Sequence, residues 1–398
     1  MLALEDWDQL RGMAMATLVY RYAERAFQKI LHYTPPDQQW AGGPSMPRLF
    51  DSFRLRNVTL KNRIGVSPMC QYSAHQGMVS QWHMAHLGGF AKGGAGLVIM
   101  EATAVAPEGR ITPFDTGLWN DAQMEALRPV VAFMESQGSL PGIQIAHAGR
   151  KASHARPWDG GAQLPLDHGG WETVGPSPIA FSPQTRTPRP MTSLDARQLI
   201  DDFASAADRA RKAGFKWLEI HAAHGYLLHS FLSPLSNHRQ DQYGGDVLGR
   251  ARLLLDVVRA CRATWGDEYP LTVRISASDW APGGLTIDDS IAVCHLLKRE
   301  NVDLIDVSSG GTVPDAKIPM TPGYQVPFAT RIRRETGLPT AAVGLITEPA
   351  FADGLIEREE ADLVFLGREL LRDPHWPLRA ARELGVTCPV PPQYARAF

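Results

Sequence analysis

The sequence predicts a parallel (β/α)8 barrel, and three observations lead to this prediction. Eight short runs are apolar and rich in β-branched residues along their whole length, as strands covered on both faces of a sheet are. Longer amphipathic stretches of helical period separate most of these runs. Nearly every run ends in a polar, sulfur-bearing or glycine residue, and the loops that follow the strands build the active site in such barrels.

The predicted strands span residues 63–69, 96–105, 142–148, 217–223, 271–278, 304–309, 340–346 and 363–367. The clearest predicted helices span residues 195–212, 248–264, 286–300 and 328–335. A doubly wound open sheet is the alternative for such an alternation. It is disfavoured because the first strand is not followed by a Gly-x-Gly-x-x-Gly turn.

The 398 residues are enough for one barrel and a further segment. We expect the barrel and a C-terminal tail to occupy residues 47–398, and residues 1–46 to form an extension whose role the sequence does not indicate. An apolar stretch at 13–20 follows Glu5, Asp6 and Asp8, whereas a signal peptide has basic residues there. No run has the length of a membrane span, so we expect no membrane partner.

Charge and cysteine content exclude several classes of function. Lys and Arg number 40 against 42 Asp and Glu, so nothing favours nucleic acid or an anionic surface as a partner. The four cysteines lie far apart in the sequence and do not have zinc or iron–sulfur spacing. Such sparse cysteine usage is typical of a reducing compartment, which predicts a cytoplasmic protein.

The strongest local signal is the sequence His-Ala-Ala-His-Gly-Tyr at 221–226, where the fourth predicted strand ends. The two histidines could be metal ligands, but the spacing is three and the Glu of His-Glu-x-x-His is missing. The two histidines could instead have no catalytic role and simply form hydrogen bonds with backbone groups. A third hypothesis is that His221 and His224 polarise a substrate oxygen while Tyr226, a phenol protonated at neutral pH, supplies a proton.

These residues and several other motifs resemble the old yellow enzyme family. The resemblance covers roughly residues 48–396, and the motifs occur in the family's order. The Cys in the first motif resembles the thermophilic-like bacterial branch, and the loop within 151–176 resembles that of xenobiotic-reductase members. Besides 221–226, the matching segments are Ser-Pro-Met-Cys-Gln-Tyr at 67–72, Gln144 to Arg150, residues 231–245 and Gly-Arg-Glu-Leu-Leu-Arg-Asp-Pro at 367–374.

The resemblance implies FMN as cofactor. Cys70 would lie against the flavin ring and tune its potential, and Arg274 would stabilise the negative charge of the reduced ring. Gly344, Gly367 and Arg368 would bind the phosphate, at the loops after the last two strands where barrels commonly bind it. The cofactor-binding residues that the resemblance implies are Ser67, Pro68, Cys70, Ala102, Gln144, Arg274, Gly344, Gly367 and Arg368.

The implied reaction is that of an ene-reductase. NADPH, or NADH, reduces the flavin and leaves, and an α,β-unsaturated carbonyl or nitro compound then binds in the same pocket. His221 and His224 hold its oxygen, flavin N5 delivers hydride and Tyr226 protonates the α-carbon. Tyr72 would face the substrate. Arg396 would reach a neighbouring subunit's site, so we expect a homodimer or homotetramer.

Two other functions remain as alternatives. A metal-dependent barrel hydrolase would use His147, His221 and His224 as ligands. A non-catalytic flavin-binding redox sensor would use Cys70.

Overall fold

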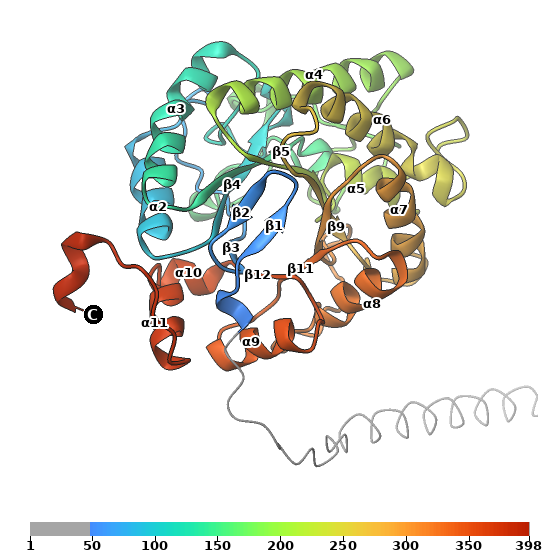
Figure 1. The fold of residues 1–398 in the computed structure, drawn as a ribbon. Helices are drawn as coiled ribbons and strands as arrows, with labels where there is room; N and C mark the ends of the chain where they lie inside the picture. The colour runs from blue at the N-terminus through green and yellow to red at the C-terminus, as the bar shows by residue number, and fades with distance from the viewer. Residues whose placement is uncertain (1–47, 398) are drawn as a thin grey trace, which may run out of the picture. The chain divides into compact units, whose positions relative to one another are not determined.

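A computed structural model describes residues 48–397, and these form a closed barrel of eight parallel strands (Figure 1). The strands pair in the order β10-β11-β12-β3-β4-β5-β8-β9, and β9 pairs with β10 to close the barrel. The closure confirms the predicted fold class over the open sheet. The barrel strands are β3 (Ile64–Val66), β4 (Leu97–Ala104), β5 (Leu140–Ala146), β8 (Trp217–Ala222), β9 (Leu271–Ser276), β10 (Leu304–Ser308), β11 (Thr340–Ala342) and β12 (Leu363–Leu366).

All eight predicted strands are present, but several end earlier than predicted. The predicted first strand continued to residue 69, whereas β3 ends at Val66, and the predicted seventh continued to 346, whereas β11 ends at Ala342. In both places the chain leaves the barrel to form a loop at its carboxyl end. The predicted extension at residues 1–46 lies outside the described residues.

Helices surround the barrel, and the four that were predicted are α4, α6, α7 and α8 (Figure 1). Thr192 begins α4 with a capping box, because its hydroxyl accepts from Asp195 N while Asp195 accepts from Thr192 N. None of the described helices is long and apolar enough to cross a membrane. The helices are α2 (Gln81–Lys92), α3 (Asp121–Ser136), α4 (Ser193–Ala213), α5 (Leu227–Leu232), α6 (Val247–Trp265), α7 (Ile287–Arg299), α8 (Val326–Thr336), α9 (Pro349–Glu357), α10 (Arg368–Arg372) and α11 (Trp376–Glu383).

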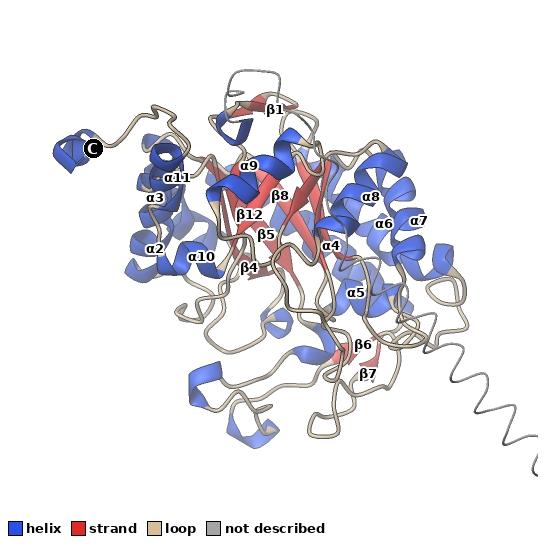
Figure 2. Cartoon of the chain, turned by 90° about the horizontal axis from the view of Figure 1, so that it is seen from below, coloured by secondary structure: helices blue, strands red, loops and turns tan. Residues whose placement is uncertain are grey.

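An antiparallel hairpin of β1 (Phe53–Leu55) and β2 (Val58–Leu60) closes the amino end of the barrel (Figures 1 and 2). Its apolar side chains pack against inward-facing residues of the barrel strands. Burying them removes apolar surface from water, which is the main stabilising contribution there. This amino-end cluster consists of Val58, Leu60, Leu97, Ile99, Trp217, Leu304, Ala341, Leu363 and Phe365.

Long loops lie at the opposite end (Figure 2). The longest, residues 147–192, joins β5 to α4 and contains the short parallel strands β6 (Val174–Gly175) and β7 (Arg189–Pro190). Arg186 fixes its shape, since the guanidinium donates to the carbonyl oxygens of Leu164 at 2.6 Å and Trp171 at 3.1 Å. Loops of this length in a compact domain commonly take part in binding or catalysis.

Candidate functional site

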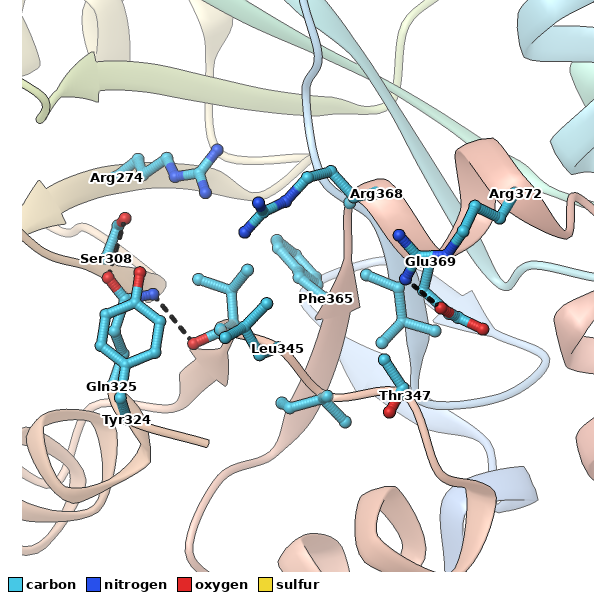
Figure 3. Close-up of a pocket in the computed structure, with 15 residues that line it drawn as sticks. Arg274, Ser308, Tyr324, Gln325, Leu345, Thr347, Phe365, Arg368, Glu369 and Arg372 are labelled. Atoms are coloured by element: carbon cyan, nitrogen blue, oxygen red, sulfur yellow. Dashed lines mark hydrogen bonds and ion pairs between the residues drawn. The ribbon is translucent and has the colours of Figure 1, made fainter. Parts of the chain in front are cut away.

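Most predicted site residues lie at the carboxyl ends of adjacent strands. His221 near the end of β8 is in register with Arg274 of β9, and Arg274 is in register with Asp306 of β10. Gly344 follows β11, and Gly367 follows β12. A cavity of about 210 Å³ opens there (Figure 3). Its lining consists of Arg274, Ser308, Tyr324, Gln325, Val343, Gly344, Leu345, Ile346, Thr347, Phe365, Leu366, Gly367, Arg368, Glu369 and Arg372.

Two guanidinium groups face this cavity, Arg274 from β9 and Arg368 from the start of α10 (Figure 3). Gly344 has φ +129°, and a Cβ there would lie 3.1 Å from the Tyr324 ring and from Gln325 Nε2. A side chain would therefore be strained and would reduce the space of the cavity. Arg368 beside an open glycine backbone matches what a phosphate group requires, and Arg274 adds a second positive charge on the β9 side of the cavity.

The histidine loop, residues 221–226, gathers three predicted catalytic side chains. The His221 ring centroid lies 5.1 Å from that of His224 and 5.1 Å from that of Tyr226. His224 adopts φ +60° and Gly225 φ +74°, where a Cβ on Gly225 would lie 2.1 Å from the Gly311 carbonyl oxygen. The left-handed turn thus needs glycine and brings Tyr226 back against His221.

Burial sets the protonation states of these side chains. It lowers the pKa of both His221 and His224 well below the usual value, and the positive charge of Arg274 lowers each further. Burial also raises the pKa of Tyr226 well above its usual value. At neutral pH the site therefore holds two uncharged imidazoles, each of which can donate one hydrogen bond, and a protonated phenol, which can act as an acid.

A buried carboxylate holds the histidine loop in place. Asp279 lies 3.1 Å from His229 Nε2, and His229 Nδ1 accepts from Gly225 N at 2.8 Å. Asp279 also accepts from the hydroxyls of Ser233 at 2.6 Å and Thr312 at 2.7 Å. One carboxylate thus connects the loops that follow β8, β9 and β10. Neither Asp279 nor His229 was predicted from the sequence.

The loop after β3 carries Ser67, Pro68, Cys70 and Tyr72. A bulge in β4 between Met100 and Ala102 turns Glu101 toward this loop. Glu101 then accepts from Gln71 N at 2.7 Å and lies 3.1 Å from His83 Nε2. Glu101 thereby fixes the backbone next to Cys70.

Burial raises the pKa of the Cys70 thiol well above its usual value, and the carboxyls of Asp115 and Glu101 raise it further. A reactive sensor cysteine needs the opposite environment, one that favours the thiolate. The redox-sensor alternative thus gains no support from this site. Tyr72 has φ +49°, and its ring lies 5.9 Å edge-on from that of Trp158 in the long loop.

Gln144 and Arg274 each contact a buried carboxyl group that the sequence analysis did not identify. Gln144 Nε2 donates to Glu219 Oε1 at 2.8 Å, and Arg274 Nε lies 3.0 Å from Asp306 Oδ2. Ala102 is in register with Gln144 across β4 and β5. The sequence did contain a signal for the two acids. Each lies within an apolar strand two residues before a residue of the site, Glu219 before His221 and Asp306 before Ser308, and therefore shares its face of the strand.

Lys151 was also missed. Its Nζ donates to the His224 carbonyl oxygen at 2.8 Å and to that of Gly311 at 3.1 Å, and lies 5.1 Å from the Tyr226 ring centroid. Burial and Arg150 lower its pKa to about 8. Lys151 follows directly after the Gln144 to Arg150 motif, so its position beside the motif was the only sequence signal.

The ligands of the alternative metal site do not form a group. His147 Nδ1 accepts from Gly149 N at 3.0 Å, and burial lowers its pKa to about 4. Among residues 48–397 there is no group of three or more His, Cys, Asp or Glu side chains placed to hold a metal ion. Arg396 is exposed in the C-terminal 3-10 helix Pro392–Ala397, which projects from the barrel (Figure 1). Its place in a neighbouring subunit's site stays a prediction.

A cavity suited to phosphate beside neutral imidazoles and a phenol defines a cofactor-binding α/β barrel. Residues 48–386 match the family model described as NADH:flavin oxidoreductase / NADH oxidase family. The NADPH dehydrogenase of Geobacillus sp. (strain WCH70) is 49% identical over 352 residues, which cover 88% of this chain and 98% of that protein.

Solved structures agree with this match. Morphinone reductase has a TM-score of 0.72 at 25% identity, and the match covers 88% of this chain and 93% of that chain. The old yellow enzyme homologue from Zymomonas mobilis has a TM-score of 0.70 at 28% identity, covering 87% and 98%. This chain belongs to the NADH:flavin oxidoreductase / NADH oxidase family, the old yellow enzyme family that the sequence motifs indicated, and it is an oxidoreductase.

Proposed function

We propose that the chain is an NADPH dehydrogenase that binds FMN and reduces activated C=C bonds of α,β-unsaturated carbonyl or nitro compounds. One arrangement carries the proposal: uncharged His221 and His224 and protonated Tyr226 lie together at the end of β8, with the His221 ring centroid 5.1 Å from each of the other two. They adjoin the strand whose Arg274 faces the cavity. The 49% identity with a NADPH dehydrogenase supports NADPH as the reductant.

The residues present fit FMN. Arg368 and the backbone at Gly344 and Gly367 would hold its phosphate, and Gln144, Arg274 and Ala102 its pyrimidine edge. Within residues 48–397, Ser67 Oγ is buried without a hydrogen-bond partner, which a polar ligand there would supply. When bound, FMN would supply the two-electron step, accepting hydride from NADPH and passing it to the substrate.

His221 and His224 would polarise the substrate oxygen. His221 Nδ1 accepts from Ala223 N at 3.3 Å, which leaves the proton of the neutral ring on Nε2. His224 Nε2 lies 2.7 Å from Ser308 Oγ. The Ser308 hydroxyl also lies 3.3 Å from its acceptor Gln325 Oε1; when it donates instead along the shorter contact to His224, the His224 proton is on Nδ1. Both rings then offer an N–H to an oxygen that becomes negative during reduction, and Tyr226 gives its proton to the α-carbon.

Tyr226→Phe tests this assignment. We expect alkene reduction to fall about 100-fold or more, since a positioned acid contributes roughly 10²–10⁴ in rate. Reduction of the bound flavin by NADPH should keep its rate, because that step does not use the phenol. Stopped-flow absorbance measures both half-reactions, with cyclohexenone as acceptor. Tyr243→Phe is the control, because Tyr243 is a buried tyrosine that packs on Phe231. Equal loss of both half-reactions would contradict the assignment.

A further inference from the structure

Two carboxyl groups lie inside the barrel, between the amino-end cluster and the histidine loop. Side chains alternate along a strand, so Trp217, Glu219 and His221 of β8 share the inward face. Trp217 belongs to the amino-end cluster and His221 to the site, which places Glu219 between them. On β10, Asp306 lies between Leu304 of the cluster and Ser308 of the cavity in the same way.

Each carboxyl contacts a side chain that is proposed to hold the pyrimidine edge of the flavin. Gln144 Nε2 donates to Glu219 Oε1 at 2.8 Å, and Arg274 Nε lies 3.0 Å from Asp306 Oδ2. Both acids are fully buried. Within the described part of the chain, Glu219 Oε2 and Asp306 Oδ1 lack a hydrogen-bond partner, whereas Asp306 Oδ2 is held by the ion pair with Arg274. Buried polar atoms are rarely left so, which points to a function for this pair.

The charges around the pair do not balance. Arg274 is the cation that interacts with both acids, and the other neighbours are the uncharged Gln144 and Thr272. Inward-facing Ile99 and Phe365 of the amino-end cluster add no charge from β4 and β12. Two ionised carboxylates and one guanidinium would leave a net negative charge in a low-dielectric interior, where charge interactions are strong.

Burial raises the pKa of Glu219 to about 8, and the neighbouring Asp306 contributes to the rise, while Arg274 and the hydrogen bonds from Gln144 and Thr272 oppose it. Glu219 is therefore ionised above about pH 8 before negative charge is added nearby. Burial also raises the pKa of Asp306, but Arg274 opposes it. Asp306 is therefore the acid that stays ionised beside Arg274, and Glu219 is the acid that takes a proton when negative charge is added.

We propose that Glu219, paired with Asp306, is a redox-linked proton acceptor behind the flavin site and sets the flavin potential through Gln144 and Arg274. The inference rests on the proposed function, because it requires flavin beside Arg274. Both acids act as positioning residues, since neither contacts the substrate.

The proton balance closes over a catalytic cycle. Above about pH 8, Glu219 would take one proton from solvent when NADPH reduces a bound flavin, and this proton would offset the negative charge gained beside Arg274. Glu219 would return that proton to solvent when the substrate is reduced. The proton that reaches the substrate would come from Tyr226, and solvent would then reprotonate the phenolate. Each cycle thus consumes one solvent proton through Tyr226, while the Glu219 proton is neither consumed nor produced.

The midpoint potential of the FMN-loaded enzyme, measured against pH by equilibration with a redox dye, tests this inference. For a two-electron couple each proton taken up adds about 30 mV of slope per pH unit, since a tenfold change in equilibrium constant is 29.6 mV. We expect a steeper segment, by about 30 mV per pH unit, in the wild type above about pH 8, where Glu219 is ionised in the oxidised enzyme and protonated in the reduced one. Glu219→Gln, which can still accept from Gln144, should lack this segment and take up one proton fewer on photochemical reduction with a pH indicator.

Asp303→Asn is the matched control. Asp303 is an acid at the amino end of the barrel that pairs with Arg262 at 2.6 Å and Arg56 at 2.6 Å, and its replacement should leave the slope unchanged. Identical slopes and proton counts for wild type and Glu219→Gln would overturn the inference, although NADPH would still bleach the flavin. A protein that binds no flavin would overturn the proposed function itself. If Glu219→Gln does not retain flavin, a wild-type slope with no steeper segment overturns the inference alone.

Discussion

Asp279→Asn should destabilise the protein strongly, because each oxygen of this buried carboxylate has its own donors. Oδ2 accepts from Ser233 Oγ and from Leu285 N at 2.7 Å, while Oδ1 accepts from Thr312 Oγ1 and lies 3.1 Å from His229 Nε2. An asparagine supplies one oxygen and one amide. Whichever way it turns, its amide meets the N–H of Leu285 or of His229, and that buried donor loses its acceptor.

The expected cost follows from these contacts. Leaving one buried donor unsatisfied costs about 1–3 kcal/mol, and hydrogen bonds to a charged group are worth about 1.5–3 kcal/mol. The sum, about 2.5–6 kcal/mol, brackets the cost of about 3–5 kcal/mol for breaking a buried ion pair. Because His229 holds Gly225 N, the same change should also loosen the histidine loop.

Urea unfolding at pH 7, followed by tryptophan fluorescence, measures the loss. Asp288→Asn is the control, since Asp288 pairs with Arg331 with 76% of its side chain exposed, and such pairs contribute about 0–1 kcal/mol. A loss below about 1 kcal/mol for Asp279→Asn, or one equal to that of the control, would refute the reasoning.

The difference in unfolding free energy between wild type and Asp279→Asn should also depend on pH. Burial alone would raise the pKa of Asp279, but the interaction with His229 and the bonds from Ser233 and Thr312 hold it well below the usual value. A lowered carboxyl pKa gives stability that is fully present above the unfolded value of about 3.9 and is lost as pH falls through the folded value. The difference between wild type and Asp279→Asn should therefore persist down to about pH 4 and narrow below it.

Two further predictions concern the cofactor site. Gly344→Ala should weaken FMN binding at least about tenfold, because at φ +129° its Cβ would lie 3.1 Å from Tyr324 and Gln325; fluorescence titration measures the affinity. Gly89→Ala is the control. Gly89 lies in α2, a Cβ there would have no atom within 4 Å, and this variant should bind FMN as the wild type does. Cys70 should react with iodoacetamide at pH 7 at least about tenfold more slowly than glutathione, because burial raises its pKa. A rate equal to that of glutathione would restore the redox-sensor hypothesis.

The barrel was predictable because its strands are buried on both faces and so appear as apolar runs, such as residues 363–367. The hairpin was not, because β1 and β2 have three residues each and show no alternation long enough to detect. The strand ends at Ala342 and Val66 were placed too late, since apolar residues continue into loops that line the site. Packing, not propensity, ends these strands.

In the candidate site, too, some residues could be predicted from the sequence and others could not. His221 and Arg368 were predicted because polar residues at strand ends are conspicuous in the sequence, and Arg274 was predicted from the family resemblance. Asp279 and Lys151 were missed because their importance lies in tertiary contacts, with His229 and with the His224 carbonyl oxygen. No local pattern records such contacts, since the partners lie 50 and 73 residues away.

Some side chains of the candidate site are positioned by the barrel strands and others by the loops. The amino-end cluster fills the lowest level with apolar side chains, and strand register then fixes the buried acids and the side chains they contact. The groups that would act on the flavin thus depend on the strands. Tyr72 depends instead on loops, and its neighbour Trp158, with 62% of its surface exposed, belongs to the longest of them. Changes in that loop would alter which substrates enter, while the reaction would stay the same.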